Sequence, residues 1–509
     1  MNEKIVVIDF GGQYSQLIAR RIRENHVYSI ILPHSVSLNE INSQYPSGII
    51  LTGGADDVWE NDSKKISSEI FNLNIPILGI CYGAQLISKM FGGSVVRSKN
   101  KEFGQVPITL LNSEIFNNIE KSNICLMSHS NEIETLSSNF KIIASTKNCK
   151  IAAFENFDKK IFGLQFHPEV VHTPFGNELI KNFLVVICKC KCEWNTKNFL
   201  ETCIKNLKEK IGKKKVLCAL SGGLDSTVTS IMLQKAIGEQ LYCIFIDHGM
   251  MRKNEKDYIK KIFKNNFKIN LIIKDAEERF LSKLRNVFQA EEKRKKIGEE
   301  FIKIFEEEAI KLGEIDFLAQ GTIYPDVIES GLGNSSIIKS HHNVGGIPKN
   351  IKFKEIIEPL KMLFKDEVRE LGNILNIPKE LLLRQPFPGP GFAVRSIGEI
   401  TKEKLNIVKE ANKIFEEEIQ KCELNIKINQ YFAIVLDTKS VGVMGDCRTY
   451  EYVVVLRAVK TLDFMTATWV KIPHEILDKI SSRITNEVDH VNRVVYDITC
   501  KPPATIEWE

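Results

Sequence analysis

Short apolar runs alternate with amphipathic stretches through the first part of the chain. Strands are predicted at Ile5–Asp9, Gly48–Thr52, Ile75–Ile80 and Phe162–Phe166. Strands that alternate with helices favour a mostly parallel sheet, so this region is expected to be α/β. Ligands of such sheets bind beyond the carboxyl ends of the strands, where Gly53, Gly54 and Cys81 all stand.

A second α/β pattern begins near Lys213. Its predicted elements are a strand at Val216–Leu220, a loop at Ser221–Ser226, a helix at Thr227–Ala236 and a strand at Leu241–Asp247. Together these elements make one βαβ unit, for which a right-handed crossover is expected. A long helix with an apolar stripe is predicted at Glu291–Leu312.

A third region follows the segment Gln385–Gly391, whose prolines and glycines predict an ordered, extended connection. Beyond it the pattern indicates an α+β unit, with strands at Ala433–Asp437 and Glu451–Leu456 and a helix at Pro473–Val488. At 509 residues the chain is too long for one core. We therefore expect an α/β multidomain protein with domains at 1–192, 193–384 and 385–509.

The composition is that of an ordinary globular protein, with 43% hydrophobic and 26% charged residues. A net charge of +5 is weak for this length and does not argue for a nucleic-acid or membrane partner. The start of the chain does not have the form of a signal peptide, and no apolar run reaches the roughly 18 residues of a membrane span. We expect a cytoplasmic protein whose twelve cysteines are thiols.

Cys81 is a candidate nucleophile because it stands where a predicted strand meets a predicted helix. Its flanking glycines, Gly79 and Gly83, permit a tight backbone turn, and the helix N-terminus favours the thiolate. His167 and Glu169 are two residues apart, so they share a face of extended chain, and the carboxylate can orient the imidazole. The pattern predicts a thiolate that attacks an amide.

The segment Gly79–Gln85, taken with Phe166–Glu169, resembles the class I glutamine amidotransferases. This resemblance implies that Cys81 is the nucleophile and that His167 and Glu169 complete a catalytic triad. The backbone N–H groups of Gly54 and Tyr82 are expected to bind the oxyanion. The positions implied for holding glutamine are Gln85, Ser128 and His129. The sequence departs from the family at Ala55, usually proline, and at Ser130-Asn131, usually Gly-Asp.

The loop Ser221–Ser226 is a candidate nucleotide site because it follows a strand and opens a helix. Backbone N–H groups at such a helix start suit a polyphosphate, and Asp225 is placed to hold Mg²⁺ on the phosphates. The loop resembles the PP-loop of the ATP pyrophosphatases. The positions expected to bind ATP are Ser221, Gly222, Gly223, Leu224, Asp225, Ser226, Thr227, Asp247 and Gly321.

The full length of the chain resembles the glutamine-hydrolysing GMP synthases. The most specific matches are Gly321–Ser330, Lys339–Gly346, Arg384–Gly391 and Lys501–Glu509. The resemblance implies that ATP adenylates XMP, that ammonia from glutamine replaces the adenylated oxygen, and that GMP and AMP leave. It places Arg294, Lys501 and Glu507 at the XMP site. It also places Lys339, His341 and His342 in a lid over the nucleotides, and it implies a homodimer whose third domain contributes to the XMP site.

Other interpretations are open from the residues alone. A PP-loop also fits an NAD synthetase or a tRNA-modifying enzyme, although the modest charge argues against RNA. A nucleotide-binding regulator that has lost catalysis is the alternative of another class. The spacing Cys188-Lys189-Cys190-Lys191-Cys192 is poor for a tetrahedral metal site, so we interpret it as a domain edge. The sequence leaves open whether ammonia would pass between the sites through a tunnel, by a domain rotation, or by both.

Overall fold

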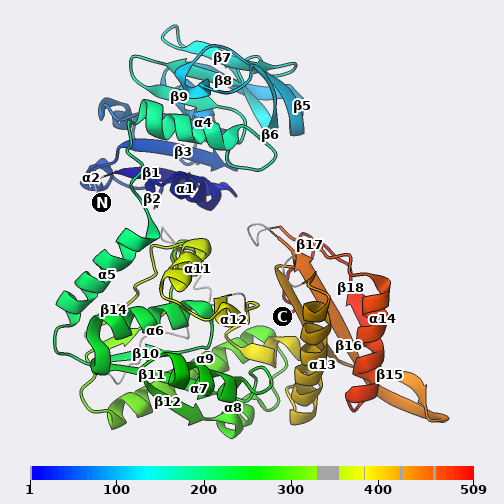
Figure 1. The fold of residues 1–509 in the computed structure, drawn as a ribbon. Helices are drawn as coiled ribbons and strands as arrows, with labels where there is room; N and C mark the ends of the chain where they lie inside the picture. The colour runs from blue at the N-terminus through cyan, green and yellow to red at the C-terminus, as the bar shows by residue number, and fades with distance from the viewer. Residues whose placement is uncertain (1–2, 330–352, 354, 383, 425–427, 462–465) are drawn as a thin grey trace. The chain divides into compact units, whose positions relative to one another are not determined.

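The computed structural model describes residues 3–509 except 330–352, 354, 383, 425–427 and 462–465 (Figure 1). The chain forms two compact units. One holds Met1–Phe199, and the other holds Leu200–Val327 together with the C-terminal part of the chain. No helix in the described part of the chain is long and apolar enough to cross a membrane.

The first unit is built on a mixed sheet. In spatial order its strands are β2 (Tyr28–Pro33), β1 (Lys4–Phe10), β3 (Gly48–Gly54), β4 (Ile77–Ile80), β9 (Ile161–Leu164), β8 (Ala153–Asn156), β7 (Lys141–Thr146), β5 (Ser94–Leu110) and β6 (Ser122–Thr135). The pairs from β2 to β9 are parallel, and those from β9 to β6 are antiparallel. The parallel part is the predicted sheet; the antiparallel extension was not predicted from the sequence.

Helices flank the parallel strands of this unit. They are α1 (Ser15–Glu24), α2 (Leu38–Ser43), α3 (Tyr82–Met90) and α4 (Gly176–Asn182) (Figure 1). Strands β1, β3 and β4 are largely buried, which explains their nearly continuous apolar sequences. In α3 every residue from Tyr82 to Ser88 is buried, so the helix that follows Cys81 is fixed on all sides.

The second unit contains a parallel sheet. Its strands are β12 (Asn270–Asp275), β11 (Leu241–Asp247), β10 (Val216–Ala219), β13 (Phe317–Ala319) and β14 (Glu355–Ile357), in that order within the described residues. Its helices are α5 (Thr196–Ile211), which begins in the first unit, α6 (Leu224–Ile237), α7 (Glu255–Asn266), α8 (Glu277–Leu284), α9 (Ala290–Lys311), α10 (Tyr324–Glu329), α11 (Lys365–Ile374) and α12 (Lys379–Leu382). The strand order reverses between β10 and β13, so their carboxyl ends form a topological switch point.

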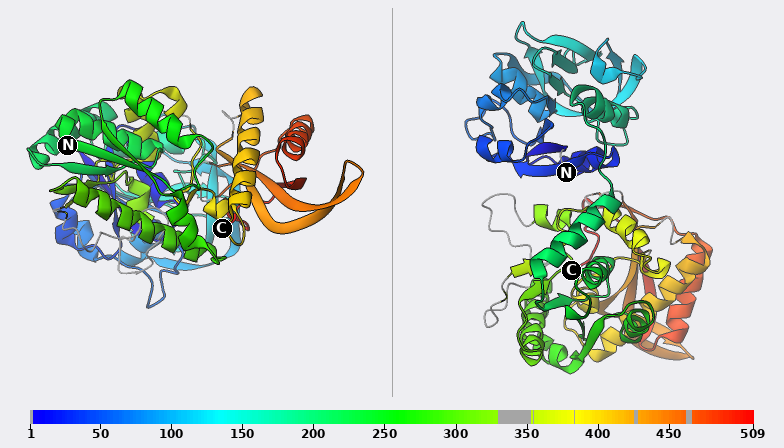
Figure 2. Two further views of the ribbon diagram at one scale, coloured as in Figure 1. Left: turned by 90° about the horizontal axis from the view of Figure 1, so that it is seen from below. Right: turned by 60° about the vertical axis from the view of Figure 1, so that its left-hand side comes forward.

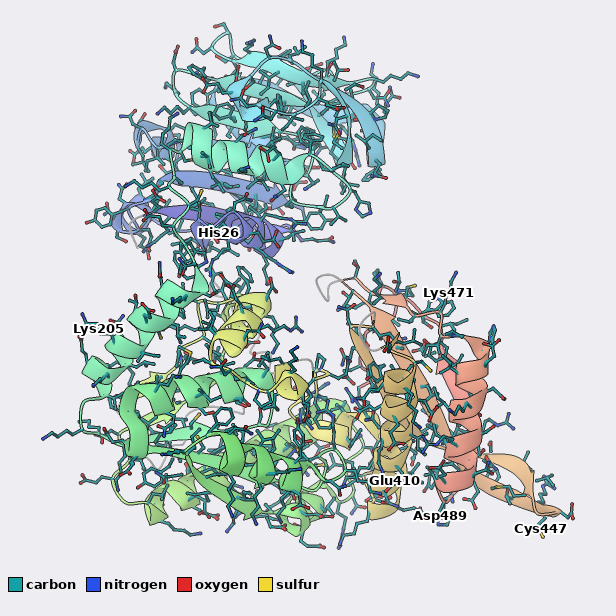
Figure 3. The ribbon with its side chains drawn as sticks, in the orientation of Figure 1. His26, Lys205, Glu410, Cys447, Lys471 and Asp489 are labelled. Carbon is teal, nitrogen blue, oxygen red and sulfur yellow. The ribbon has the colours of Figure 1, made fainter. Side chains whose placement is uncertain are left out.

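The C-terminal part adds a second sheet to this unit. Its elements are α13 (Lys402–Lys421), β15 (Gln430–Met444), β16 (Cys447–Lys460), β17 (Thr468–Trp469), α14 (His474–Glu487) and β18 (Val491–Asp497). One hydrophobic core joins it to the parallel sheet, since Leu217 and Ile244 belong to the same cluster as Val454 and Leu456. The β15–β16 hairpin projects from this sheet (Figure 2), and Cys447 lies at its tip (Figure 3).

Several predicted boundaries differ from the structure. Strand β9 ends at Leu164 and not at Phe166, because Gln165 N donates to Ala152 O and His167 N donates to Leu126 O instead of continuing the parallel ladder. Helix α6 begins at Leu224 and not at Thr227, because Thr227 N already donates to the carbonyl of Gly223. Strands β15 and β16 are longer than predicted because they form one long hairpin.

Candidate active sites

Cys81 occupies a strained elbow between β4 and α3. Its φ of 51° and ψ of −106° lie in a region that side chains other than glycine rarely adopt. A Cβ at Gly83 would lie 2.3 Å from the carbonyl oxygen of Leu51, and one at Gly79 would lie 2.7 Å from Ala84 N. Both glycines are therefore required for the close packing of α3 on the sheet that fixes this elbow.

His167 and Glu169 lie beside Cys81 because β9, which precedes them, pairs in parallel with β4. The Nδ1 atom of His167 is 2.7 Å from Oε1 of Glu169, and both side chains are buried. Burial by itself would lower the pKa of His167, but the Glu169 carboxylate and hydrogen bonds with Cys81 and Glu169 raise this pKa well above its usual value. The structure thus brings the three predicted triad residues together.

Gly54 and Tyr82, the residues predicted to bind the oxyanion, lie next to one another. A Cβ at Gly54 would be 3.2 Å from Cγ of Tyr82 and 3.1 Å from the carbonyl oxygen of Phe10. The Tyr82 ring packs against Phe10, with ring centroids 5.4 Å apart. This packing fixes Tyr82 against the end of β3; the oxyanion role of the two N–H groups stays a prediction.

Of the residues predicted to hold glutamine, Ser128 lies near the Cys81 sulfur and Gln85 is bonded to other protein groups. The carbonyl oxygen of Ser128 lies 3.9 Å from Sγ of Cys81. Gln85 is buried and donates through Nε2 to Asn131 O, 3.1 Å, and to Oε1 of Gln165, 3.0 Å. Ser128 therefore faces the sulfur, whereas the nitrogen of the Gln85 amide is engaged within the protein.

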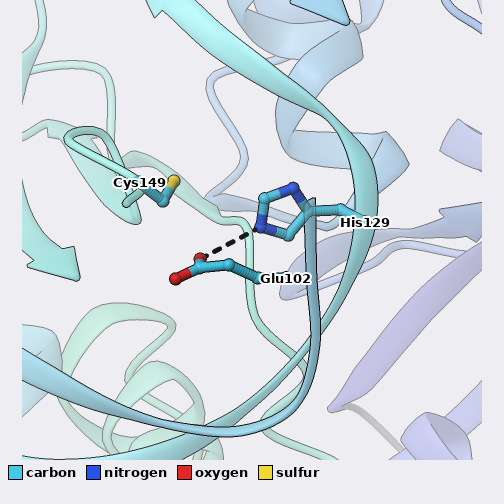
Figure 4. A group of neighbouring side chains, drawn as sticks. All are labelled: Glu102, His129 and Cys149. Atoms are coloured by element: carbon cyan, nitrogen blue, oxygen red, sulfur yellow. Dashed lines mark ion pairs between the residues drawn. The ribbon is translucent and has the colours of Figure 1, made fainter. Parts of the chain in front are cut away.

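His129 points into a buried cluster with Glu102 and Cys149 (Figure 4). Its Nδ1 atom lies 2.9 Å from Asn131 O, and its Nε2 atom lies 3.4 Å from a carboxylate oxygen of Glu102. The hydroxyl of Thr146 donates to the same carboxylate. Burial, together with Glu102, raises the pKa of the Cys149 thiol to about 12, which keeps this sulfur protonated. The His129 ring therefore fixes the Ser128–Asn131 segment through its contacts with Asn131 O and Glu102.

The PP-loop of the second unit follows β10 and opens α6. Gly222 has a φ of +79°, and a Cβ there would lie 3.0 Å from Oε1 of Glu255. The hydroxyl of Ser226 lies 3.0 Å from that of Ser221 and donates to Gly223 O, 3.1 Å. The first N–H groups of a helix have no acceptor inside that helix. The loop therefore presents donors at the carboxyl end of β10, next to the switch point.

Asp225 and Gly321 lie at the same edge of the sheet. The Asp225 carboxylate is half-buried and pairs with Nζ of Lys365, which lies 2.6 Å from both of its oxygens. A Cβ at Gly321 would lie 2.8 Å from Ser226 N, so glycine allows the segment after β13 to approach the loop. Asp247 ends β11, the neighbouring strand, and its side chain accepts from Gly249 N.

Two of the predicted XMP residues, Lys501 and Glu507, lie on the C-terminal tail, and the third, Arg294, contacts the tail from α9. The Glu507 carboxylate accepts two hydrogen bonds from the buried guanidinium of Arg395, 2.7 and 3.0 Å, and one from Gln430, 2.9 Å. Arg294 donates to the backbone oxygen of Glu509. Lys501 pairs through its backbone with Ala467. The tail is thus docked onto α9 and the C-terminal sheet; the lid residues Lys339, His341 and His342 lie outside the described residues.

Sequence reasoning missed several charged side chains at this site. Lys365 donates to the Asp225 carboxylate. Arg384 donates two hydrogen bonds to Glu255, which lies next to the PP-loop. The buried Lys293 donates to the Glu509 carboxylate. Arg384 begins one of the motif strings, so its position was visible but its partner was not. The others stand in ordinary charged helical sequence, and only the tertiary fold shows their partners.

Comparison with known families matches three parts of the chain. Residues 6–187 match the family of class I glutamine amidotransferases, and residues 196–369 match the PP-loop domain. Residues 417–508 match the GMP synthase C-terminal domain. These matches agree with the strained Cys81 elbow in the first unit and with the phosphate-type loop in the second. The chain is therefore of the class that joins an amidotransferase to a nucleotide-activating unit.

Relatives match over the whole chain. A glutamine-hydrolysing GMP synthase of Acetivibrio thermocellus is 57% identical over 509 residues and covers 100% of both chains. One from Clostridium tetani is 56% identical over 508 residues, covering 100% of this chain and 99% of its own. A solved glutamine amidotransferase from Thermotoga maritima is 18% identical, covers 37% of this chain and 100% of its own, and has a TM-score of 0.31. This chain belongs to the glutamine-hydrolysing GMP synthase family.

Proposed function

We propose that the chain hydrolyses glutamine at Cys81 and uses the ammonia to convert XMP to GMP, with ATP cleaved to AMP and pyrophosphate. The observation that carries this proposal is that one chain holds both a Cys81–His167–Glu169 contact and a PP-loop at a switch point. Membership of the GMP synthase family supports XMP as the acceptor. The domain limits 1–192, 193–384 and 385–509 belong to this proposal.

At the first site, His167 takes the thiol proton of Cys81 while the sulfur attacks the side-chain carbonyl of glutamine. His167 then returns the proton to the departing ammonia, and water, deprotonated by the same imidazole, cleaves the thioester to glutamate. Glu169 holds Nδ1 of His167 and stabilises the imidazolium. The raised pKa of His167 favours this charged form of the ring.

At the second site, the PP-loop binds the phosphates of ATP, and Asp225 would hold Mg²⁺. The donor set fits this ion, since Mg²⁺ in nucleotide enzymes is usually bound by one or two carboxylates together with substrate phosphates. A bound Mg²⁺ would neutralise charge on the departing pyrophosphate. Lys365 pairs with both oxygens of the Asp225 carboxylate, and its ammonium is a further cation for the phosphates at this edge of the sheet.

We place XMP against the C-terminal tail, with Arg294 and Lys501 as cations for its phosphate and Glu507 as an acceptor for ring N–H or ribose hydroxyls. Support comes from the fixed position of Glu507 on Arg395 and Gln430. The Arg395 guanidinium also stacks on Phe432, 4.0 Å from the ring centroid. The Glu507 carboxylate bonded to this guanidinium is therefore held in one position.

A cytoplasmic homodimer remains part of the proposal. The arm formed by β15 and β16 exposes apolar side chains, with Val443 76% exposed and Tyr450 67% exposed. Such surface on a projecting hairpin is typical of an association site. Val443→Lys should lower the mass measured by light scattering to that of a monomer, and an unchanged mass would contradict the role of this arm.

The direct test of the synthetase is XMP-dependent exchange of labelled pyrophosphate into ATP by the full-length chain with Mg²⁺. Exchange that requires XMP, and that nicotinate adenine dinucleotide or tRNA does not replace, is the expected result. Exchange driven by either of those acceptors would identify a different PP-loop enzyme. A complete lack of exchange by folded protein that still binds ATP would favour a regulator.

A further inference from the structure

Gln165 is buried, only 1% exposed, and its side chain reaches the reactive sulfur. Its Nε2 atom lies 3.7 Å from Sγ of Cys81, within the range of a hydrogen bond to sulfur. Gln165 directly follows β9, and its backbone N–H donates to Ala152 O, so the side chain starts from a fixed point. This contact comes in addition to the predicted triad.

The orientation of the Gln165 amide follows from its neighbours. Gln85 lies between Asn131 O and the Gln165 amide, at 3.1 and 3.0 Å. A backbone carbonyl only accepts, so the atom of Gln85 that faces both groups is its NH₂ nitrogen. That nitrogen needs an acceptor on Gln165, which is Oε1, and the NH₂ group of Gln165 is then the end that faces Cys81.

The same carbonyl is fixed from its other side. Asn131 O also lies 2.9 Å from Nδ1 of His129, which must donate to it, and the His129 ring is backed by Glu102. A continuous series of buried contacts therefore runs from Glu102 through His129, Asn131 O and Gln85 to Gln165. Because each member is held by the next, the amide cannot rotate its oxygen toward the sulfur without breaking two hydrogen bonds.

The groups around the sulfur favour different protonation states. The Ser128 carbonyl, 3.9 Å away, accepts from a thiol and repels a thiolate. The Gln165 NH₂ group donates to the sulfur, and such a bond strengthens when the acceptor carries charge. Donation from the Gln165 amide supports the thiolate that attacks glutamine, and also the thiolate released when water cleaves the thioester.

We propose that Gln165 is a further catalytic residue of the glutaminase, one whose amide stabilises the Cys81 thiolate, and that Gln85 is the positioning residue that aims it. This inference rests on the proposed function of Cys81 as nucleophile. In this proposal Gln85 orients the Gln165 amide and needs no contact with the substrate. It also gives a reason for a fully buried amide immediately before Phe166-His167.

The test is the pH dependence of Cys81 alkylation by iodoacetamide in the full chain, followed by mass spectrometry of the Cys81 peptide. Gln165→Met keeps the length of the side chain and removes the donor, and Gln165→Glu keeps the shape and adds charge. Both should slow alkylation at pH 7 about tenfold or more, the size of one charged hydrogen bond, and move the half-maximal rate to higher pH. Gln85→Met should give a smaller shift in the same direction.

Ammonia-driven GMP formation by each variant, unchanged within about twofold, shows that the second unit is intact, and thermal melting shows that the first unit is folded. A folded Gln165→Met protein with the alkylation profile of the unaltered chain would overturn the role of Gln165. Failure of the proposed function looks different: unaltered protein fully alkylated at Cys81 would still make GMP from glutamine.

Discussion

The two candidate sites differ in how their reactive groups are paired within the protein. In the first unit, His167 contacts both Cys81 and Glu169 in the geometry that their chemistry needs. In the second, Asp225 is paired with Lys365, and Glu507 with Arg395. A covalent reaction on a neutral amide uses a nucleophile, a base and a carboxylate in fixed contact, whereas a site for polyanions gathers charged side chains that pair with one another.

Because of this difference, we expect the glutaminase and the synthetase activities to respond to different kinds of mutation. The glutaminase should respond to changes that disturb orientation around one sulfur, and it should do so without affecting the synthetase. The synthetase should respond to changes in charge and in the approach of the loop, and it should then lose product from either nitrogen source.

Glu169→Gln should have the largest effect and should act on the glutamine route alone. The amide can donate to Nδ1 of His167 and hold the wrong tautomer, so glutamine-driven GMP formation should fall about 10³–10⁴-fold. Ammonia-driven formation should stay within twofold. Glu155→Gln, also buried in this unit, is the matched control. Equal losses in both routes would contradict the separation of the sites.

Asp225→Asn should lower both routes together, by about 10²-fold or more, because it removes the charge proposed to hold Mg²⁺. The measurement is GMP formed from glutamine and from ammonia at saturating Mg²⁺. Asp275→Asn, at the end of β12 in the same sheet, removes an exposed carboxylate paired with Lys256 and should leave both rates nearly unchanged. A loss confined to one nitrogen source would place Asp225 outside the shared chemistry.

Gly321→Ala should act through geometry at the nucleotide site. Its Cβ would lie 2.8 Å from Ser226 N, so the loop must shift, at a cost of about 1–3 kcal/mol. The KM for ATP should rise in both routes while hydrolysis of glutamine is spared. A Cβ at Gly389 meets nothing within 4 Å, which makes Gly389→Ala the control. Equal KM values for the two variants would exclude the close approach inferred here.

The last expected effect is that of His248, on stability in acid. Burial, followed by the charge of Lys409, lowers its pKa to about 3, against about 6.5 in an unfolded chain. The unfolded state therefore takes up a proton first, and stability is complete above about pH 6.5 and falls as the pH drops toward 3. The slope is about 1.4 kcal/mol per pH unit. Urea titrations of His248→Asn should show a shallower decline; an identical decline would contradict the buried neutral ring.

Much of the fold could be predicted because its signals are local. Parallel strands such as β1 and β11 are apolar runs closed by glycine or aspartate, and the Leu241–Asp247 boundary is confirmed residue for residue. The antiparallel strands β5 and β6 were missed, since their sequences are half polar and exposed. They pair with distant segments, and local pattern carries little information about such pairing.

The site was predictable to the same degree. Cys81, His167 and the PP-loop have sequence spacings that follow from their chemistry, and the structure brings Cys81 and His167 together. Gln165 and Lys365 contact partners 84 and 140 residues away, so no spacing reveals them. For His129 the sequence suggested a place near glutamine, whereas its ring nitrogens face Asn131 O and Glu102.

The most direct measurement is GMP formation by Cys81→Ala from XMP, ATP and Mg²⁺ with either glutamine or ammonia, beside Cys203→Ala as control. The account predicts that the Cys81 variant makes no GMP from glutamine and makes it from ammonia at the rate of the unaltered chain. Product from glutamine, or loss of the ammonia reaction in a folded variant, would contradict the claim that one site releases nitrogen and a second one uses it.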